Sequence, residues 1–166
     1  MQKKIKEMTE QNVLQKLRAI CSRSEHCSYE MQEKMTRWGV DEQTQARIIS
    51  ALVKGKYIDD KRFARAFAND KVRYNKWGKR KVEQALYLKH IDEDIRHSVL
   101  NDIEEDDFKT ALQPLLQTKI KSIKAKNDYE LNCKLIRFAL GRGYELEEIK
   151  ECLTSIFKED KEKTTK

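Results

Sequence analysis

Apolar residues recur at helical spacing in three segments of the chain that can be written over one another without gaps. The segments run from Tyr29 to Leu52, from Arg80 to Ile103 and from Cys133 to Ile156. Their apolar positions coincide in six columns: Met31, Val82 and Leu135; Met35, Leu86 and Ala139; Val40, Ile91 and Tyr144; Ile48, Val99 and Cys152; Ile49, Leu100 and Leu153; and Leu52, Ile103 and Ile156. Since residues three and four positions apart share a helix face, each segment predicts two helices around a short turn.

The turn has similar chemistry in all three segments. Gly39 and Gly143 stand where the end of a helix favours a residue in the left-handed conformation. His90 occupies that place in the middle segment, and histidine is one of the residues that enter this conformation more readily. An acidic residue follows two positions later, where it suits the beginning of the next helix: Asp41, Asp92 and Glu145.

A further helix is predicted before each pair. The first covers roughly residues 13–23, the second follows Asp59-Asp60, and the third contains Leu115 and Ile120. Pro114 lies within the last apolar pattern, so it should start that helix or kink it. We therefore predict an all-α fold, an elongated and curved array of three tandem three-helix repeats. The predicted divisions are 1–57 (repeat 1 with a basic N-terminal extension), 58–106 (repeat 2 with a basic face), 107–158 (repeat 3) and 159–166 (a charged tail).

The composition agrees with a helical fold and excludes several other classes. Five Gly and one Pro among 166 residues are too few for a fold rich in hairpins. No apolar run approaches the length of a membrane span, and the first residues lead into no apolar stretch typical of a secretory signal. Four cysteines without a Cys-x-x-Cys pair indicate reduced thiols. We expect a cytoplasmic protein that does not contact membranes, and a monomer because no coiled-coil seam is visible.

Charge is distributed unevenly along the chain, whose formal net charge is +7. Residues 61–90 carry ten Lys and Arg against two acids, residues 91–107 carry one against eight, and residues 108–145 carry eight against three. The two basic blocks favour a polyanionic partner over a merely solubilising surface. The acidic run from Asp102 to Asp107 is interpreted as a solvated linker and helix cap, or as a contact for a basic partner or for the basic block itself.

Sequence signatures of catalysis are missing. No glycine opens a phosphate-binding loop, and the histidines lack the His-Glu-x-x-His spacing. Cys21, His26 and Cys27 lack a fourth ligand at a plausible spacing for zinc, and Cys152 falls in a core column. We expect a protein that is not an enzyme and has neither cofactor nor metal.

The first basic block is the sharpest functional feature. Its cations are Lys61, Arg62, Arg65, Lys71, Arg73, Lys76, Lys79, Arg80 and Lys81. Tyr74 and Trp77 are interleaved with them, a pattern that suits phosphate contacts with rings available for stacking. In the alternative interpretation, Trp77 packs inside its repeat and the cations are only solvated. The run from Lys79 to Lys81 begins a helix, where the helix dipole disfavours positive charge unless an anion binds there.

Two stretches of this chain resemble the RecX family of regulatory proteins. The central stretch comprises Ile58-Asp59-Asp60-Lys61-Arg62-Phe63-Ala64, then Gly78-Lys79-Arg80-Lys81-Val82-Glu83-Gln84-Ala85-Leu86 and Lys89-His90-Ile91-Asp92. Ile136-Arg137-Phe138-Ala139-Leu140-Gly141-Arg142-Gly143-Tyr144 is similar to the family's C-terminal stretch. The resemblance covers about residues 12–156. His90 in place of the usual glycine, Trp77 and Pro114 depart from the family pattern and leave the local geometry open.

The resemblance implies an all-helical modulator of the bacterial recombinase RecA, acting in DNA repair and the SOS response. Such a protein would lodge in the groove of the RecA filament on single-stranded DNA and suppress filament growth, ATP hydrolysis and strand exchange. Direct contact with single-stranded DNA would be weak or secondary. The residues carried over as contact candidates are Arg62, Lys79, Arg80, Lys81, Arg137 and Arg142, and charge alone adds Arg65, Arg73 and Lys76.

Two other functional classes stay open on the residues alone. In the first, tandem helix-turn-helix units bind DNA directly, with tight and strongly salt-dependent affinity for naked DNA. In the second, the chain is a structural adaptor that uses only protein contacts.

Overall fold

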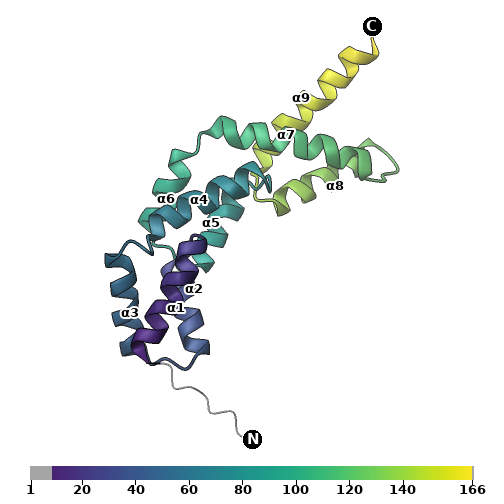
Figure 1. Cartoon of the computed structure of the whole chain (residues 1–166). Coiled ribbons are helices and arrows are strands. Elements are labelled where there is room, and N and C mark those ends of the chain that lie inside the picture. Colours follow the sequence, from purple (N-terminus) through teal and green to yellow (C-terminus); the bar gives the residue numbers. More distant parts are fainter. Residues whose placement is uncertain (1–8, 166) are drawn as a thin grey trace, which may run out of the picture.

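The computed structural model describes residues 9–165, which form nine α-helices. These are α1 (Glu10–Arg23), α2 (Ser28–Arg37), α3 (Glu42–Lys54), α4 (Asp60–Arg73), α5 (Lys79–Leu88), α6 (Glu93–Asp102), α7 (Glu105–Ser122), α8 (Asp128–Gly141) and α9 (Leu146–Thr164). Figure 1 shows three successive triplets in a bent, elongated body, with α3, α6 and α7 along the outer side and α5 and α8 along the inner side. The predicted all-α array of tandem repeats is confirmed. None of the helices in the described part of the chain is long and apolar enough to cross a bilayer.

The turns inside the triplets have the backbone conformation that the spacing predicts. Gly39, His90 and Gly143 have φ angles of 76°, 55° and 93°, all in the left-handed region. Asp41 then caps α3, because its carboxylate accepts a hydrogen bond from the backbone N–H of Thr44 at 3.1 Å. The Thr44 hydroxyl donates a second hydrogen bond to this carboxylate at 2.6 Å, and the two bonds hold the pKa of Asp41 below its usual range.

Two separate apolar cores hold the molecule together. The first triplet encloses Val13, Leu17, Met31, Met35, Ile48, Leu52 and Ile58. The second and third triplets share one larger core, in which α4 packs against α7 and the buried side chains of all six helices α4 to α9 are continuous. Neighbouring repeats therefore share a core from α4 to α9, whereas the first triplet has a core of its own.

Of the two positions that the sequence left open for Pro114, the helix start is excluded, because Pro114 lies well inside α7. Proline lacks the N–H that would bond to the carbonyl of Thr110 one turn earlier, and its ring crowds that carbonyl. Pro114 is exposed, so the carbonyl that loses its partner lies on the solvent side of the helix. Burial of Phe108, Leu112 and Leu116 on the opposite face keeps α7 continuous across the proline.

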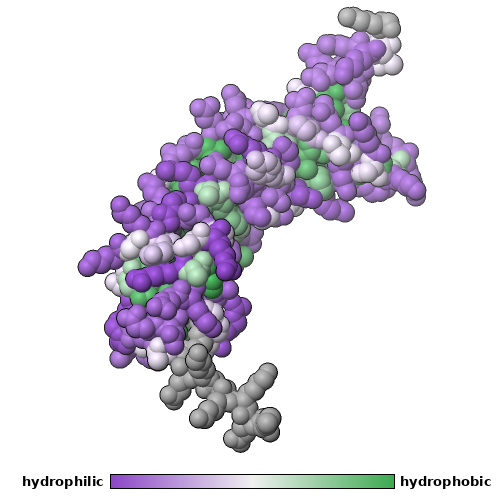
Figure 2. Space-filling model, viewed as in Figure 1, coloured by the Kyte–Doolittle hydropathy of each residue, from purple (hydrophilic) through white to green (hydrophobic). Residues whose placement is uncertain are grey.

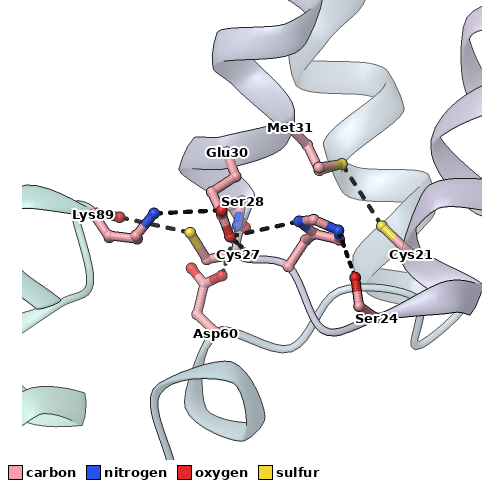
Figure 3. A network of polar contacts seen from close by, with 9 residues as sticks. Cys21, Ser24, Cys27, Ser28, Glu30, Met31, Asp60 and Lys89 are labelled. Atoms are coloured by element: carbon pink, nitrogen blue, oxygen red, sulfur yellow. Dashed lines mark hydrogen bonds and ion pairs between the residues drawn. The ribbon is translucent and has the colours of Figure 1, made fainter. Parts of the chain in front are cut away.

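The first triplet meets the second through a polar joint at the beginning of α2 (Figure 3). The backbone N–H of Ser28 donates to Asp60 at 2.8 Å, and the ammonium of Lys89 lies 3.3 Å from the carboxylate of Glu30. Cys27 is buried between them, with its Sγ 3.9 Å from the carbonyl oxygen of Lys89. Burial raises the pKa of the Cys27 thiol to about 12. The joint is therefore a small buried thiol surrounded by hydrogen bonds and ion pairs.

Candidate nucleic-acid interface

The α4–α5 loop and the α8–α9 turn meet through their backbones. The N–H of Gly78 donates to the carbonyl of Arg142 at 2.7 Å, and the N–H of Arg80 donates to the carbonyl of Gly143 at 3.2 Å. A Cβ on Gly78 would lie well inside 3.0 Å of the Gly143 carbonyl, so a side chain has no room there. This contact fixes how the third triplet sits on the second.

Tyr144 adds a buried hydrogen bond to the same contact. Its hydroxyl donates to the carbonyl of Lys76 at 2.9 Å, and the ring is 1% exposed. Burial raises the pKa of the phenol, so Tyr144 stays a neutral donor at physiological pH. Lys76 itself has a φ of 56°, a left-handed conformation that its sequence position does not predict.

The Trp77 ring packs inside its repeat, as the alternative interpretation of the basic block expects. It makes an edge contact with Phe67 at a centroid distance of 6.4 Å. The ammonium groups of Lys71 and Lys81 lie 4.9 Å and 4.6 Å from the ring centroid, consistent with cation–π contacts. Trp77 is therefore partly buried against the core, whereas Tyr74 is 72% exposed.

Several predicted cations gather around the contact between the loop and the turn. Arg80 and Lys81 lie beside the turn that holds Arg142, and the backbone of Lys76 is tied to the same turn by the hydrogen bond from Tyr144. Arg73 and Lys76 line one pocket of about 190 Å³ between α4 and α7. The structure thus joins cations from the two basic blocks, although more than sixty positions separate them in the sequence.

Lys119 was not among the sequence-based candidates, yet it contacts the same aromatic ring as Arg142. Their charged groups lie 4.8 Å and 5.1 Å from the centroid of the Phe138 ring. Lys119 belongs to the second basic block, so net charge alone pointed to its region but not to the residue.

Arg62 and Arg65 stand apart from this group because acidic side chains hold them. Arg62 donates to Glu25 of the first triplet at 2.6 Å, and Arg65 lies 3.4 Å from Asp102. The acidic run therefore reaches the basic block through Asp102, as one interpretation of that run expects. Glu105, Asp106 and Asp107 form the first turn of α7, as the helix-cap interpretation expects.

Three candidates project into solvent with little to hold them. Lys79 and Arg137 are exposed, and their side chains make no hydrogen bond or ion pair with any residue between 9 and 165. Arg80 is 65% exposed and lies 3.7 Å from Glu145 in a surface ion pair of the kind that contributes little to stability. In keeping with this, Figure 2 shows hydrophilic residues over most of the visible face, with hydrophobic residues mainly in the seams between helices.

Two family models match the second and third triplets. Residues 59–100 match the model described as RecX, second three-helix domain, and residues 105–153 match RecX, third three-helix domain.

Full-length relatives and solved structures agree with these matches. The chain is 32% identical over 131 residues to Regulatory protein RecX of Clostridium tetani, covering 77% of this chain and 59% of that protein. It is 30% identical over 135 residues to Regulatory protein RecX of Vibrio parahaemolyticus, covering 81% and 85%. The chain thus spans about three fifths of the length of its clostridial relatives.

The fold is similar to that of a crystal structure of regulatory protein RecX, with a TM-score of 0.80 at 13% identity over 87% of this chain and 71% of that one. It is also similar to a crystal structure of RecX from Lactobacillus salivarius, with a TM-score of 0.77 at 16% identity over 88% and 95%. The matched domains, the identity to the Vibrio relative and the shared fold together show that this chain belongs to the RecX family of regulatory proteins.

Proposed function

We propose that this chain is a non-catalytic regulator that binds the RecA filament on single-stranded DNA and limits its growth, ATP hydrolysis and strand exchange. The observation that carries the proposal is the gathering of Lys76, Arg80, Lys81 and Arg142 where two repeats meet, in a chain of the RecX family. The contact between Gly78 and Gly143 presents these cations from a fixed backbone, so little ordering is needed when they bind.

The electrostatics of this surface suit a partner that carries phosphates. Arg80 is held only by an exposed ion pair to Glu145, which a phosphate oxygen can replace at small cost. The first turn of α5 contains Lys79, Arg80 and Lys81 and no acid, so an anion there would also relieve repulsion from the helix dipole. A bent body with a cationic inner junction can follow a helical groove that contains DNA.

The direct test is the DNA-dependent ATPase of the cognate RecA on single-stranded DNA, with this protein added well below one molecule per RecA. We expect inhibition at that ratio, because competition for bare DNA would require far more protein. The variant Arg80→Glu/Lys81→Glu should lose most of the inhibition. Its matched control, Lys158→Glu/Lys161→Glu, makes the same charge change on the exposed end of α9 and should retain the inhibition.

Two outcomes would replace the proposal. Absence of inhibition, together with tight and salt-sensitive binding to naked DNA, would favour the tandem helix-turn-helix protein that binds DNA directly. Full inhibition by a variant with all of Lys79, Arg80 and Lys81 reversed to glutamate would favour the adaptor that uses only protein contacts.

A further inference from the structure

A cleft of about 490 Å³ opens between α5 and the turn after α8. One wall carries Arg80, Lys81 and Tyr87 from α5, with Arg96 from α6 behind them, and the opposite wall is formed by Leu140 and Gly141. Its volume lies within the range of about 300–1,000 Å³ that is typical of pockets for small molecules, so it can hold a group the size of a nucleoside.

Tyr87 is an exposed aromatic ring in this cleft. Its exposed fraction is 63%, so most of this large apolar surface is not buried on folding. The guanidinium of Arg96 lies 5.3 Å from the ring centroid. Arg96 is itself held in place, because it donates to the carbonyl of Ile91 at 2.6 Å and its side chain is only 13% exposed. The ring is therefore supported by a fixed cation and is ready to stack on another flat group.

The opposite wall leaves room for such a group. A Cβ added to Gly141 would meet no atom within 4 Å, which means that the space next to this residue is open. Leu140 is 39% exposed and offers an apolar edge beside that space. The cleft therefore combines an aromatic face, an apolar edge and an open wall.

The charges around the ring match a nucleic-acid backbone. Arg80 and Tyr87 share one face of α5, seven positions and about 10 Å apart along the helix axis. Lys81 adds a second cation at the same end of the cleft. The acid in the cleft, Glu83, lies 3.8 Å from Arg96 and 3.9 Å from His97, so a cation partly offsets its charge. Cations that follow a backbone beside an aromatic ring are typical of binding to single strands.

We infer that Tyr87 is a stacking platform for one unpaired base of single-stranded DNA, with Arg80 and Lys81 contacting the neighbouring phosphates. Bases in a duplex are stacked on one another and offer no free face, so this platform would select single strands. The inference rests on the proposed function, since it specifies how the cationic junction contacts the DNA inside the filament.

The first experiment measures binding of a fluorescein-labelled oligothymidylate at low salt, without RecA. Tyr87→Ala should weaken binding about 10-fold, because stacking on one aromatic side chain contributes on that scale. Tyr87→Phe and Tyr87→Trp should bind like the unchanged protein, since both keep a ring. Tyr129→Ala is the matched control, because Tyr129 is 79% exposed on α8 but does not line the cleft.

A strand that contains abasic sites separates stacking from a phosphate contact. The unchanged protein should bind the abasic strand as weakly as Tyr87→Ala binds the normal strand, and Tyr87→Ala should lose nothing further. The inference would be overturned if the abasic strand weakened binding by the same factor in the unchanged protein and in Tyr87→Ala. Normal binding of the normal strand by Tyr87→Ala would also overturn it. So would a chain that binds no single strand at low salt.

The RecA ATPase distinguishes failure of the inference from failure of the proposed function. Inhibition by the unchanged protein, with single-strand binding that does not depend on Tyr87, would overturn the platform and leave the regulator in place. If Tyr87→Ala loses inhibition but binds single strands normally, the cleft holds a segment of RecA instead of a base. Binding that depends on Tyr87 without any inhibition would support the platform and overturn the regulator.

Discussion

Among single residues, Gly78 has the least room for change. A methyl group there would meet the carbonyl of Gly143 and the backbone nitrogen of Tyr144, neither of which can move like the end of a side chain. We expect Gly78→Ala to destabilise the protein by about 2 kcal/mol or more, as overpacking at a buried site does. The midpoint of urea unfolding measures the effect.

Gly141→Ala is the control for that substitution. Gly141 is the last residue of α8, and the space around it is open, so alanine should be neutral or stabilise the helix by up to about 1 kcal/mol. Equal destabilisation by the two substitutions would mean that the close approach at Gly78 is not what constrains the residue.

These positions also show what local sequence can predict about a residue. Gly39, His90 and Gly143 were assigned to left-handed turns from spacing alone, because a helix end is a local event. The requirement at Gly78 was not predictable, since it arises from a backbone 65 positions further along the chain. Trp77 allowed two interpretations for the same reason, as the lysines that cover it are placed by the fold.

Among the helices, α5 combines an unfavourable beginning with a functional surface. Its first turn has three cations and no acid, and its N-cap, Gly78, offers no side chain to cap it. Lys79→Glu should raise the melting temperature by about 1–3 °C, because an acid suits a helix N-terminus. The same change should weaken RecA inhibition. Calorimetry and the ATPase measure the two effects.

Lys158→Glu, near the end of α9, is the control for the changes in melting temperature and RecA inhibition that we expect of Lys79→Glu. It makes the same charge change on an exposed helix without removing a cation from the junction. Loss of both stability and inhibition in Lys79→Glu would contradict the argument, because it would make Lys79 a structural residue.

The helices themselves were largely predictable, since each follows from apolar spacing and caps within about twenty residues. The course of α7 was not, because proline at position 114 allowed either a helix start or a kink within a helix. The apolar face around Leu112 and Leu116 is buried against other helices and overrides that local preference.

At the scale of the whole molecule, two cores joined by a polar contact predict separate movement of the first triplet. Cys27 reports on that joint, since its thiol is buried there and burial raises its pKa, so that alkylation is slow until the joint opens. Lys89→Ala removes the ion pair to Glu30 and should increase alkylation of Cys27 several-fold by favouring joint opening. Peptide-resolved mass spectrometry measures the rate.

Cys152, in the third triplet, is the internal reference for that measurement. Burial raises the pKa of its thiol as well, and it packs against the shared core far from the joint. A parallel increase at Cys152 would indicate global unfolding and would contradict separate movement at the joint.

The charge of the candidate site was predictable from the sequence, but which residues form it was not. The basic blocks indicated the region, yet Arg62 and Arg65 are held by Glu25 and Asp102, each 37 positions away. Tyr87 carried no signal in the sequence, because only the packing of α5 against the α8 turn leaves its ring beside a cleft.

The contact between Gly78 and Gly143 also lies close to the start of the long helix α9. Helix α9 begins three residues after Gly143 and, with 19 residues, is about 28 Å long, and its far end extends beyond the other helices (Figure 1). A tilt of about 10° at the contact would therefore displace that end by about 5 Å, nearly one helical turn. The contact between two glycines in the middle of the molecule thus determines where the far end of α9 lies.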